Sequence, residues 1–282
     1  MRICRYWARA SVDHHGEATA DGEFVGVGWS EQSQADAEAR ALERARRIAE
    51  RMRDRLGAVE DLREDYYADR PLREPIVDEL HHEGRLVGAI TRNIYGAFVL
   101  NAAEAMFVDI DRPRPSVVGF FARLMGKKPE RVVDGVPERV AAVVGRHPGL
   151  GLRLYETAAG YRGLVTSRPC DPADGETKAL LEAFDSDRLY VRLCEAQQCF
   201  RARLSPKPWR VGMPTPPRQY PWLDERRRQA FEKWSQRYEQ ASRSATVCRF
   251  VDTFGEEAVH PDVQPVLSLH DELACGEAER LA

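Results

Sequence analysis

The chain has 282 residues, of which 43% are hydrophobic and 31% charged, and its formal net charge is −3. This length fits one large domain or two smaller ones, with enough apolar residues for a buried core. The sequence contains neither a run of about 18 apolar residues nor an N-terminal secretory signal, which argues against a membrane protein and a secreted protein. The scattered cysteines predict reduced thiols and a cytoplasmic location. The small negative net charge argues against a protein that binds nucleic acid over its whole surface, but it is compatible with a local basic cleft.

The first part of the chain predicts a ββα unit. Two strands are expected at residues 3–10 and 24–29, joined by a polar segment that contains glycine. A helix is expected from residue 34 to about residue 56, because Ala, Glu and Arg dominate this segment. Ser33 is a suitable N-cap for that helix.

The following segment predicts a connection rather than a compact element. Residues 58–84 are expected to form an irregular loop that contains a short helix at 75–82. A strand at 86–91 then begins the main body. We therefore divide the chain into an N-terminal unit with its connecting loop, residues 1–84, and a main domain, residues 85–282.

The stretch GAFVLNAAEAMFVDID, residues 96–111, predicts a β-hairpin whose second strand ends in Asp109 and Asp111. Side chains alternate along a strand, so these two carboxylates lie on the same face. Carboxylates are the ligands that hard cations such as Mg²⁺ or Mn²⁺ prefer, and phosphoryl transfer often uses such ions. The alternative is that the two acids are solvated or paired with Arg112 and Arg114.

The rest of the chain alternates between helical and strand-like segments. Helices are expected at 117–125, 136–147, 174–184 and 224–241, a second hairpin at 150–167, and strands at 246–253 and 263–269. Residues 189–203 predict a longer helix, with a strand as the alternative at its start. Together these segments predict an α+β fold with a mixed, largely antiparallel sheet built from hairpins and helices packed on it.

Basic side chains concentrate between residues 188 and 210. Guanidinium groups match phosphate oxygens, and the interleaved Trp209 offers a surface on which bases can stack. The residues proposed to bind phosphate are Arg201, Arg203, Lys207 and Arg210. The alternative is a solvated helix face followed by a proline-rich arm, residues 205–221. Residues 205–241 are also a candidate surface for a protein partner.

Three further features are weaker candidates. The small residues at 158–160 either allow a ligand to approach the backbone or form an ordinary turn. Cys194 and Cys199 are expected to be buried small residues, because zinc commonly requires a second cysteine pair. His270 and Asp271 follow the predicted strand 263–269 and are expected in a surface turn.

Two segments together resemble motifs of archaeo-eukaryotic primase-like catalytic domains: NIYGAFVLNAAEAMFVDID, residues 93–111, and LYETAAGYRGLVTSR, residues 154–168. That family has a hydrophobic strand that ends in a DxD pair, then a hairpin with a small-residue turn and a histidine, and later another acid. The resemblance implies a mixed α/β domain with a sheet like that of RNA-recognition domains. It also implies that Asp109 and Asp111 bind the divalent metal and that the second segment lies near nucleotide phosphates.

Arg162 stands where the family has its histidine, and the resemblance makes it the catalytic candidate beside Asp109 and Asp111. An arginine can bind phosphate but cannot take over the proton chemistry of a histidine, so a degenerate enzyme is one alternative. For the third acid, the candidates are Asp252 and Asp271. The resulting hypothesis is metal-dependent nucleotidyl or phosphoryl transfer, or nucleotide binding, with Mg²⁺ or Mn²⁺ and a nucleotide or nucleic acid as partner. The alternative is a non-catalytic protein- or nucleic-acid-binding module in which the DxD pair is only structural.

Overall fold

The computed structural model describes residues 1, 3–54, 71–112, 135–217, 220–276 and 278–282. The strands are β1 (Tyr6–Val12), β2 (Phe24–Ser30), β3 (Ile76–His82), β4 (Arg85–Arg92), β5 (Phe98–Ala102), β6 (Phe107–Asp111), β7 (Gly151–Thr157), β8 (Gly160–Val165), β9 (Phe200–Arg203) and β10 (Cys248–Gly255). The helices are α1 (Gln34–Asp54), α3 (Val136–Gly145), α4 (Gly175–Ala183), α5 (Arg188–Gln197), the 3-10 helix η3 (Pro208–Val211), α6 (Glu225–Ser242) and α7 (Gln264–Ala274).

These elements confirm the predicted α+β class, with antiparallel pairing between all of the named strands. The strands form the sheets β1-β2, β3-β4-β5-β9 and β10-β7-β8-β6. The predicted helix at 117–125 lies outside the described residues. Within the described part of the chain, no helix has both the length and the apolar character needed to cross a membrane.

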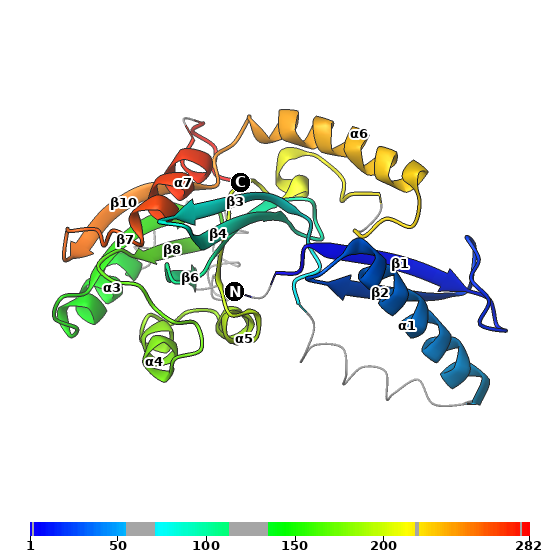
Figure 1. The fold of residues 1–282 in the computed structure, drawn as a ribbon. Coiled ribbons are helices and arrows are strands. Elements are labelled where there is room, and N and C mark those ends of the chain that lie inside the picture. The colour runs from blue at the N-terminus through cyan, green and yellow to red at the C-terminus, as the bar shows by residue number, and fades with distance from the viewer. Residues whose placement is uncertain (2, 55–70, 113–134, 218–219, 277) are drawn as a thin grey trace, which may run out of the picture.

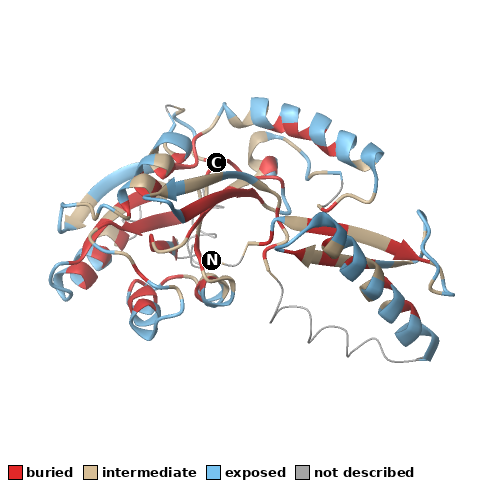
Figure 2. Ribbon diagram, viewed as in Figure 1, coloured by how far each residue is buried: buried red, intermediate tan, exposed pale blue. Residues whose placement is uncertain are grey.

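The N-terminal ββα unit has the predicted form and projects from the body (Figure 1). Helix α1 buries a row of alanines against the hairpin β1–β2, and Figure 2 shows its opposite side exposed. A Cβ atom on Gly28 would lie 2.1 Å from the carbonyl oxygen of Ala37, so helix and strand approach as closely as glycine allows. The Ser33 Oγ atom accepts a hydrogen bond of 3.1 Å from the backbone N–H of Asp36, which confirms the predicted cap.

The predicted hairpin at 96–111 is wrong, because its two strands belong to different sheets. β5 pairs with β4 and β9, whereas β6 pairs with β8. β5 is almost entirely buried, and Phe107, Val108 and Ile110 of β6 are buried as well, so the side-chain pattern indicates strands without specifying their partners. As a result, the segment that carries Asp109 links the two larger sheets.

The predicted helix at 75–82 is also wrong, since these residues form β3. β3 pairs with β4 across a turn in which Glu83 and Gly84 have φ values of 48° and 76°. The domain boundary drawn at residue 84 therefore passes through a hairpin. Pairing with β4 outweighs the weak helical preference of the Asp78 to His82 segment.

Two predictions near the C-terminus need correction. Residues 189–203 do not form one longer helix, nor a strand at their start, because the helix α5 is followed by the strand β9. Residues 263–269 lie mainly in the helix α7, whose buried residues Val266, Leu267, His270 and Ala274 follow helical spacing. The predicted hairpin at 150–167 is confirmed as β7 and β8.

The sheet β10-β7-β8-β6 has helices on both faces, with α3 and α4 below it and α7 above it in Figure 1. On the α3 side, Ile110 and Phe184 line a small cavity together with Val140. On the α7 side, the His270 ring packs 4.8 Å from the Tyr155 ring and 5.2 Å from the Phe107 ring, measured between centroids. Every residue of β8 is consequently buried, including Arg162.

Candidate functional site

The candidate site begins with a cross-strand pair at the junction of the two larger sheets. The antiparallel register of β6 and β8 places Asp109 opposite Arg162 and Asp111 opposite Gly160. Side chains of directly opposed residues project on the same face of a sheet. Both aspartates are exposed to solvent, whereas Arg162 is only 6% exposed. The structure therefore joins two sequence-predicted residues, Asp109 and Arg162, that lie in separate segments of the chain.

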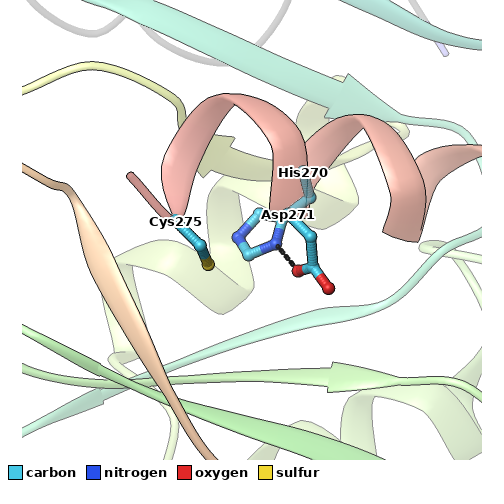
Figure 3. A group of neighbouring side chains, drawn as sticks. All are labelled: His270, Asp271 and Cys275. Carbon is cyan, nitrogen blue, oxygen red and sulfur yellow. Dashed lines mark hydrogen bonds and ion pairs between the residues drawn. The ribbon is translucent and has the colours of Figure 1, made fainter. Parts of the chain in front are cut away.

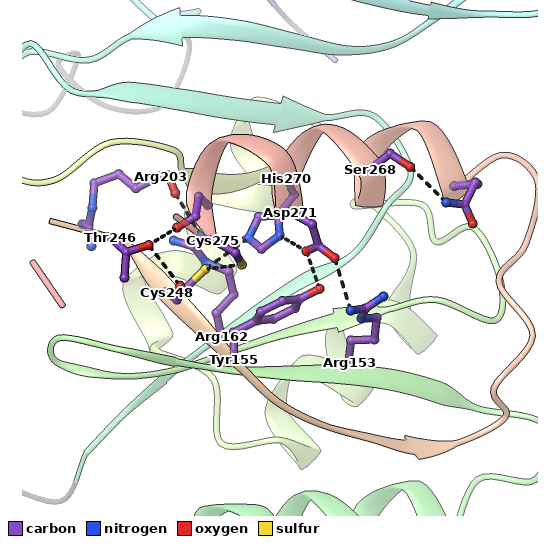
Figure 4. Close-up of polar contacts among 12 residues, drawn as sticks. Arg153, Tyr155, Arg162, Arg203, Thr246, Cys248, Ser268, His270, Asp271 and Cys275 are labelled. Atoms are coloured by element: carbon purple, nitrogen blue, oxygen red, sulfur yellow. Dashed lines mark hydrogen bonds and ion pairs between the residues drawn. The ribbon is translucent and has the colours of Figure 1, made fainter. Parts of the chain in front are cut away.

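The buried Arg162 is held by two neighbours, Arg203 and His270 (Figure 4). Its Nη1 atom donates a hydrogen bond of 2.9 Å to the carbonyl oxygen of Arg203 in β9, and the same atom lies 3.1 Å from Nε2 of His270 in α7. Arg162 thus ties β8 to both the neighbouring sheet and the covering helix. Its charge acts on Asp109 through space rather than through an ion pair.

The Asp109 side chain reaches solvent, but many protein atoms surround it and partly desolvate its carboxylate. Burial raises the pKa of Asp109, Arg162 and Arg203 oppose that rise, and the nearby Asp111 and Asp187 add to it. Among the described residues, its carboxylate has neither a hydrogen bond nor an ion pair, while its backbone is held by Ser186 and Asp187. A partly desolvated carboxylate with no direct partner is a suitable ligand for a cation.

Three of the predicted phosphate-binding residues lie within electrostatic range of one another. Burial and the charge of Arg162 lower the pKa of Arg203 to about 10, although Asp109 opposes that shift. Burial, Arg203 and Arg210 lower the pKa of Lys207, which also feels the opposing charges of Asp109 and Asp111. Among the described residues, the buried Nε atom of Arg203 has no hydrogen-bond partner. A cationic cluster that protein acids compensate only partly favours an anionic ligand.

Arg201 is the exception among the predicted phosphate-binding residues. Its guanidinium donates to both carboxylate oxygens of Glu74 at 2.7 Å. Glu74 is itself buried and accepts a further hydrogen bond from the Thr91 hydroxyl at 2.5 Å. This pairing balances the charge of Arg201 within the protein, although the buried Nε atom of Arg201 has no hydrogen-bond partner among the described residues, so we leave Arg201 out of the candidate site.

The small-residue turn between β7 and β8 serves the packing of strands. A Cβ atom on Gly160 would lie 2.1 Å from the carbonyl oxygen of Ile110. The Gly160 N–H donates to the Thr157 hydroxyl at 3.1 Å, which closes the turn. Glycine is therefore required here by the neighbouring strand β6, whether or not a ligand approaches.

His270 is the residue whose surroundings were least apparent from the sequence. Instead of lying in a surface turn, it is fully buried on α7, and its Nδ1 atom lies 3.0 Å from Oδ1 of Asp271 (Figure 3). The hydroxyl of Tyr155 donates to the same oxygen at 2.7 Å, and Arg153 is ion-paired with the other carboxylate oxygen at 3.2 Å (Figure 4). The helical spacing of Val266, His270 and Ala274 was the available signal.

The candidates for a third acid do not join Asp109. Asp252 is exposed on β10, and β10 and β6 are opposite edges of their sheet. Asp271 is committed to His270 and to the Tyr155 hydroxyl. Cys194 and Cys199 are buried as expected, and burial raises their pKa values to about 12 and about 11, so both are neutral thiols.

The arrangement places two accessible carboxylates beside a group of cations that they do not neutralise through direct contacts. A metal ion bound to a phosphate group carries the complementary charges, positive toward the aspartates and negative toward the basic residues. The resemblance of this chain to primase-like domains stays a hypothesis. No family model, curated protein or solved structure matches the chain, so the site is interpreted from its own geometry.

Proposed function

We propose that this protein binds a nucleotide through its phosphates together with a divalent cation, Mg²⁺ or Mn²⁺, as a primase-like nucleotidyl- or phosphoryl-transfer domain does. The observation that carries this proposal is the accessible Asp109 carboxylate, which lacks a direct partner among the described residues and lies within electrostatic range of Arg203 and Lys207. Two opposite charges held near each other without contact favour a ligand that carries both signs.

Each residue has a distinct role in this proposal. Asp109 and Asp111 hold the cation through oxygen ligands, the chemistry that Mg²⁺ and Mn²⁺ prefer. Arg203, Lys207 and Arg210 neutralise phosphate oxygens, with the fork of an arginine matching two oxygens at once. Arg162 holds β9, the strand that ends at Arg203, and its positive charge favours the ionised form of Asp109.

Arg162 cannot act as a proton acceptor, because a guanidinium offers only donors and stays protonated. Any transfer reaction at this site would therefore depend on the metal ion and on electrostatic stabilisation of the phosphoryl group. Binding of the nucleotide is the step that the geometry supports best. Transfer is a second step, for which an attacking group has to come from a substrate.

The proposal is tested by thermal unfolding of the full chain with Mn²⁺ and a nucleoside triphosphate, each alone and both together. We expect the highest melting temperature with both ligands, since a ligand that binds only the folded state stabilises it. The variant Asp109→Asn with Asp111→Asn should lose the additional rise in melting temperature that the two ligands produce together. The matched control is Asp252→Asn with Glu257→Gln, which changes two exposed acids elsewhere and should keep it. The absence of a shift in the unmodified protein would contradict the proposal.

A second candidate function, a surface for a protein partner within residues 205–241, is favoured by a different observation. Trp209 is 50% exposed and Tyr95 is 41% exposed, and their rings meet edge to face at 5.2 Å. Large exposed aromatic residues are enriched at protein interfaces. Trp209→Ala should abolish capture of such a partner in a pull-down, whereas addition or chelation of metal should leave capture unchanged. Capture that depends on metal would contradict this second candidate.

A further inference from the structure

Two cysteines and a histidine meet at a point that is separate from the carboxylates of β6. Cys248 opens β10, Cys275 caps the end of α7, and His270 lies one turn earlier on that helix. The two Sγ atoms are 3.5 Å apart, and the Sγ atom of Cys248 is 3.8 Å from Nε2 of His270 (Figure 4). Cys248 and His270 are fully buried, while Cys275 is partly exposed.

We propose that Cys248, Cys275 and His270 form a binding site for a thiophilic divalent cation, with Zn²⁺ as the best fit. Zinc bonds to sulfur at about 2.3 Å and to imidazole nitrogen at about 2.0–2.1 Å in tetrahedral geometry, which separates neighbouring ligand atoms by roughly 3.5–3.8 Å. The observed separations of 3.5 Å and 3.8 Å match this range. Three protein ligands leave the fourth position to a water molecule on the partly exposed side of Cys275.

The surroundings of His270 supply a second, independent observation. Metal-binding histidines commonly donate their other ring N–H to a carboxylate, which fixes the tautomer and orients the ring. Here Nδ1 of His270 lies 3.0 Å from Oδ1 of Asp271 (Figure 3), which leaves the lone pair on Nε2, the atom that Arg162 contacts at 3.1 Å and Cys248 at 3.8 Å. Tyr155 and Arg153 hold Asp271 in place, so the imidazole is already oriented for a ligand.

The charges around the thiols are consistent with this assignment. The hydrogen bond from Cys275 lowers the pKa of Cys248 despite burial, and His270 and Arg162 contribute to the lowering. When Zn²⁺ binds, any proton still on Cys248 or Cys275 passes to solvent. The two thiolates then balance the charge of the metal. Because Nη1 of Arg162 lies 3.1 Å from Nε2 of His270, metal binding displaces that contact, and Arg162 retains the carbonyl oxygen of Arg203.

The experiment is a titration of the full, reduced and chelator-treated protein with Co²⁺, a spectroscopic substitute for Zn²⁺. We expect uptake of one equivalent with the visible bands of tetrahedral cobalt and a thiolate-to-metal charge-transfer band, both removed by added Zn²⁺. Cys248→Ala and Cys275→Ala should lose the charge-transfer band or weaken binding, whereas Cys170→Ala, another buried cysteine, should not. Asp271→Asn should weaken metal binding by roughly 10–100-fold.

A second measurement uses only the unmodified protein and is independent of the folding of any variant. Zn²⁺ should slow alkylation of Cys248 and Cys275 relative to Cys170, as read by mass spectrometry. If the folded, reduced protein takes up no Co²⁺ or Zn²⁺, or if the variant with both Cys248→Ala and Cys275→Ala gives the same spectrum, the assignment is wrong. Formation of a Cys248–Cys275 disulfide with peroxide, together with no metal uptake by the reduced protein, would make the pair a redox couple instead.

Discussion

Nη1 of Arg162 lies 3.1 Å from Nε2 of His270, and because a guanidinium only donates, Nε2 of His270 is the acceptor. The ring proton is then on Nδ1, where it is donated to Asp271 at 3.0 Å. The tautomer of His270 is thereby fixed by a cation on one side and an acid on the other. Arg162 is thus part of the scaffold that holds β8, β9 and α7 together.

Replacing Arg162 should destabilise the fold more than an exposed arginine does. Arg162→Gln removes the charged donor to the Arg203 carbonyl oxygen and to His270, and we expect a loss of about 2–3 kcal/mol in the free energy of unfolding. Urea denaturation monitored by tryptophan fluorescence measures this loss. Arg192→Gln on the exposed side of α5 is the matched control and should change stability by less than about 0.5 kcal/mol. Equal stability of the two variants would show that Arg162 is dispensable for folding.

The pair of Arg201 and Glu74 distinguishes a structural arginine from a ligand-binding one. Glu74→Ala leaves the guanidinium of Arg201 buried without its bidentate partner, and we expect a destabilisation of about 3–5 kcal/mol. The double variant Arg201→Met with Glu74→Leu removes both charges and should recover most of that loss. Chemical denaturation of the three proteins gives the comparison. If Arg201→Met alone abolished nucleotide binding at unchanged stability, Arg201 would belong to the site after all.

The glycine at the start of β8 should tolerate no side chain. In Gly160→Ala the new Cβ atom would lie 2.1 Å from the backbone oxygen of Ile110, so β6 and β8 have to move apart. We expect a loss of about 1–3 kcal/mol in stability, the usual effect of overpacking. Gly175→Ala is the control, because no atom lies within 4 Å of a Cβ atom built on Gly175. Comparable melting temperatures for the two variants would mean that the strands separate without strain.

The raised pKa of Asp109 predicts a pH-dependent cost to stability in the absence of ligand. Since the folded state binds the proton of Asp109 more tightly than the unfolded chain does, stability falls as pH rises from the ordinary value of 3.8 through the raised value. Asp109→Asn carries no charge and escapes this loss. The variant should therefore unfold at a higher temperature than the unmodified protein at neutral pH, and the difference should shrink toward acidic pH. A variant that is less stable at neutral pH would contradict the assigned environment of Asp109.

The parts of the fold with local signals could be predicted from the sequence. The alanine-rich stripe of α1 with its Ser33 cap depends on neighbouring residues alone, and so does the hairpin of β7 and β8 with its short turn. The sequence predicts β5 and β6 as strands, but their assignment to different sheets depends on contacts with distant segments. The residues of β3 and α7 have mixed preferences, and tertiary packing rather than propensity selects their structure.

The candidate site shows the same limit. Because side chains alternate between the two faces of a strand, the sequence predicts that Asp109 and Asp111 of β6 share a face. The same holds for Arg201 and Arg203 of β9. Among the described residues, Glu74 pairs with Arg201 while the Nε atom of Arg203 has no hydrogen-bond partner, and this difference depends on a segment far away in the sequence. The contact of Cys248 with Cys275 and His270 depends likewise on the packing of α7 against β10.

The most direct test of the central claim is calorimetric titration of the protein with a nucleoside triphosphate, with and without Mn²⁺. If one site holds the metal at Asp109 and the phosphates at Arg203, each ligand has to raise the affinity for the other by the same factor. We predict tighter nucleotide binding with Mn²⁺ in the unmodified protein, loss of that gain in Asp109→Asn, and weak binding under both conditions in Arg203→Gln. Nucleotide affinity that is the same with and without Mn²⁺, or unchanged by both substitutions, would contradict the account.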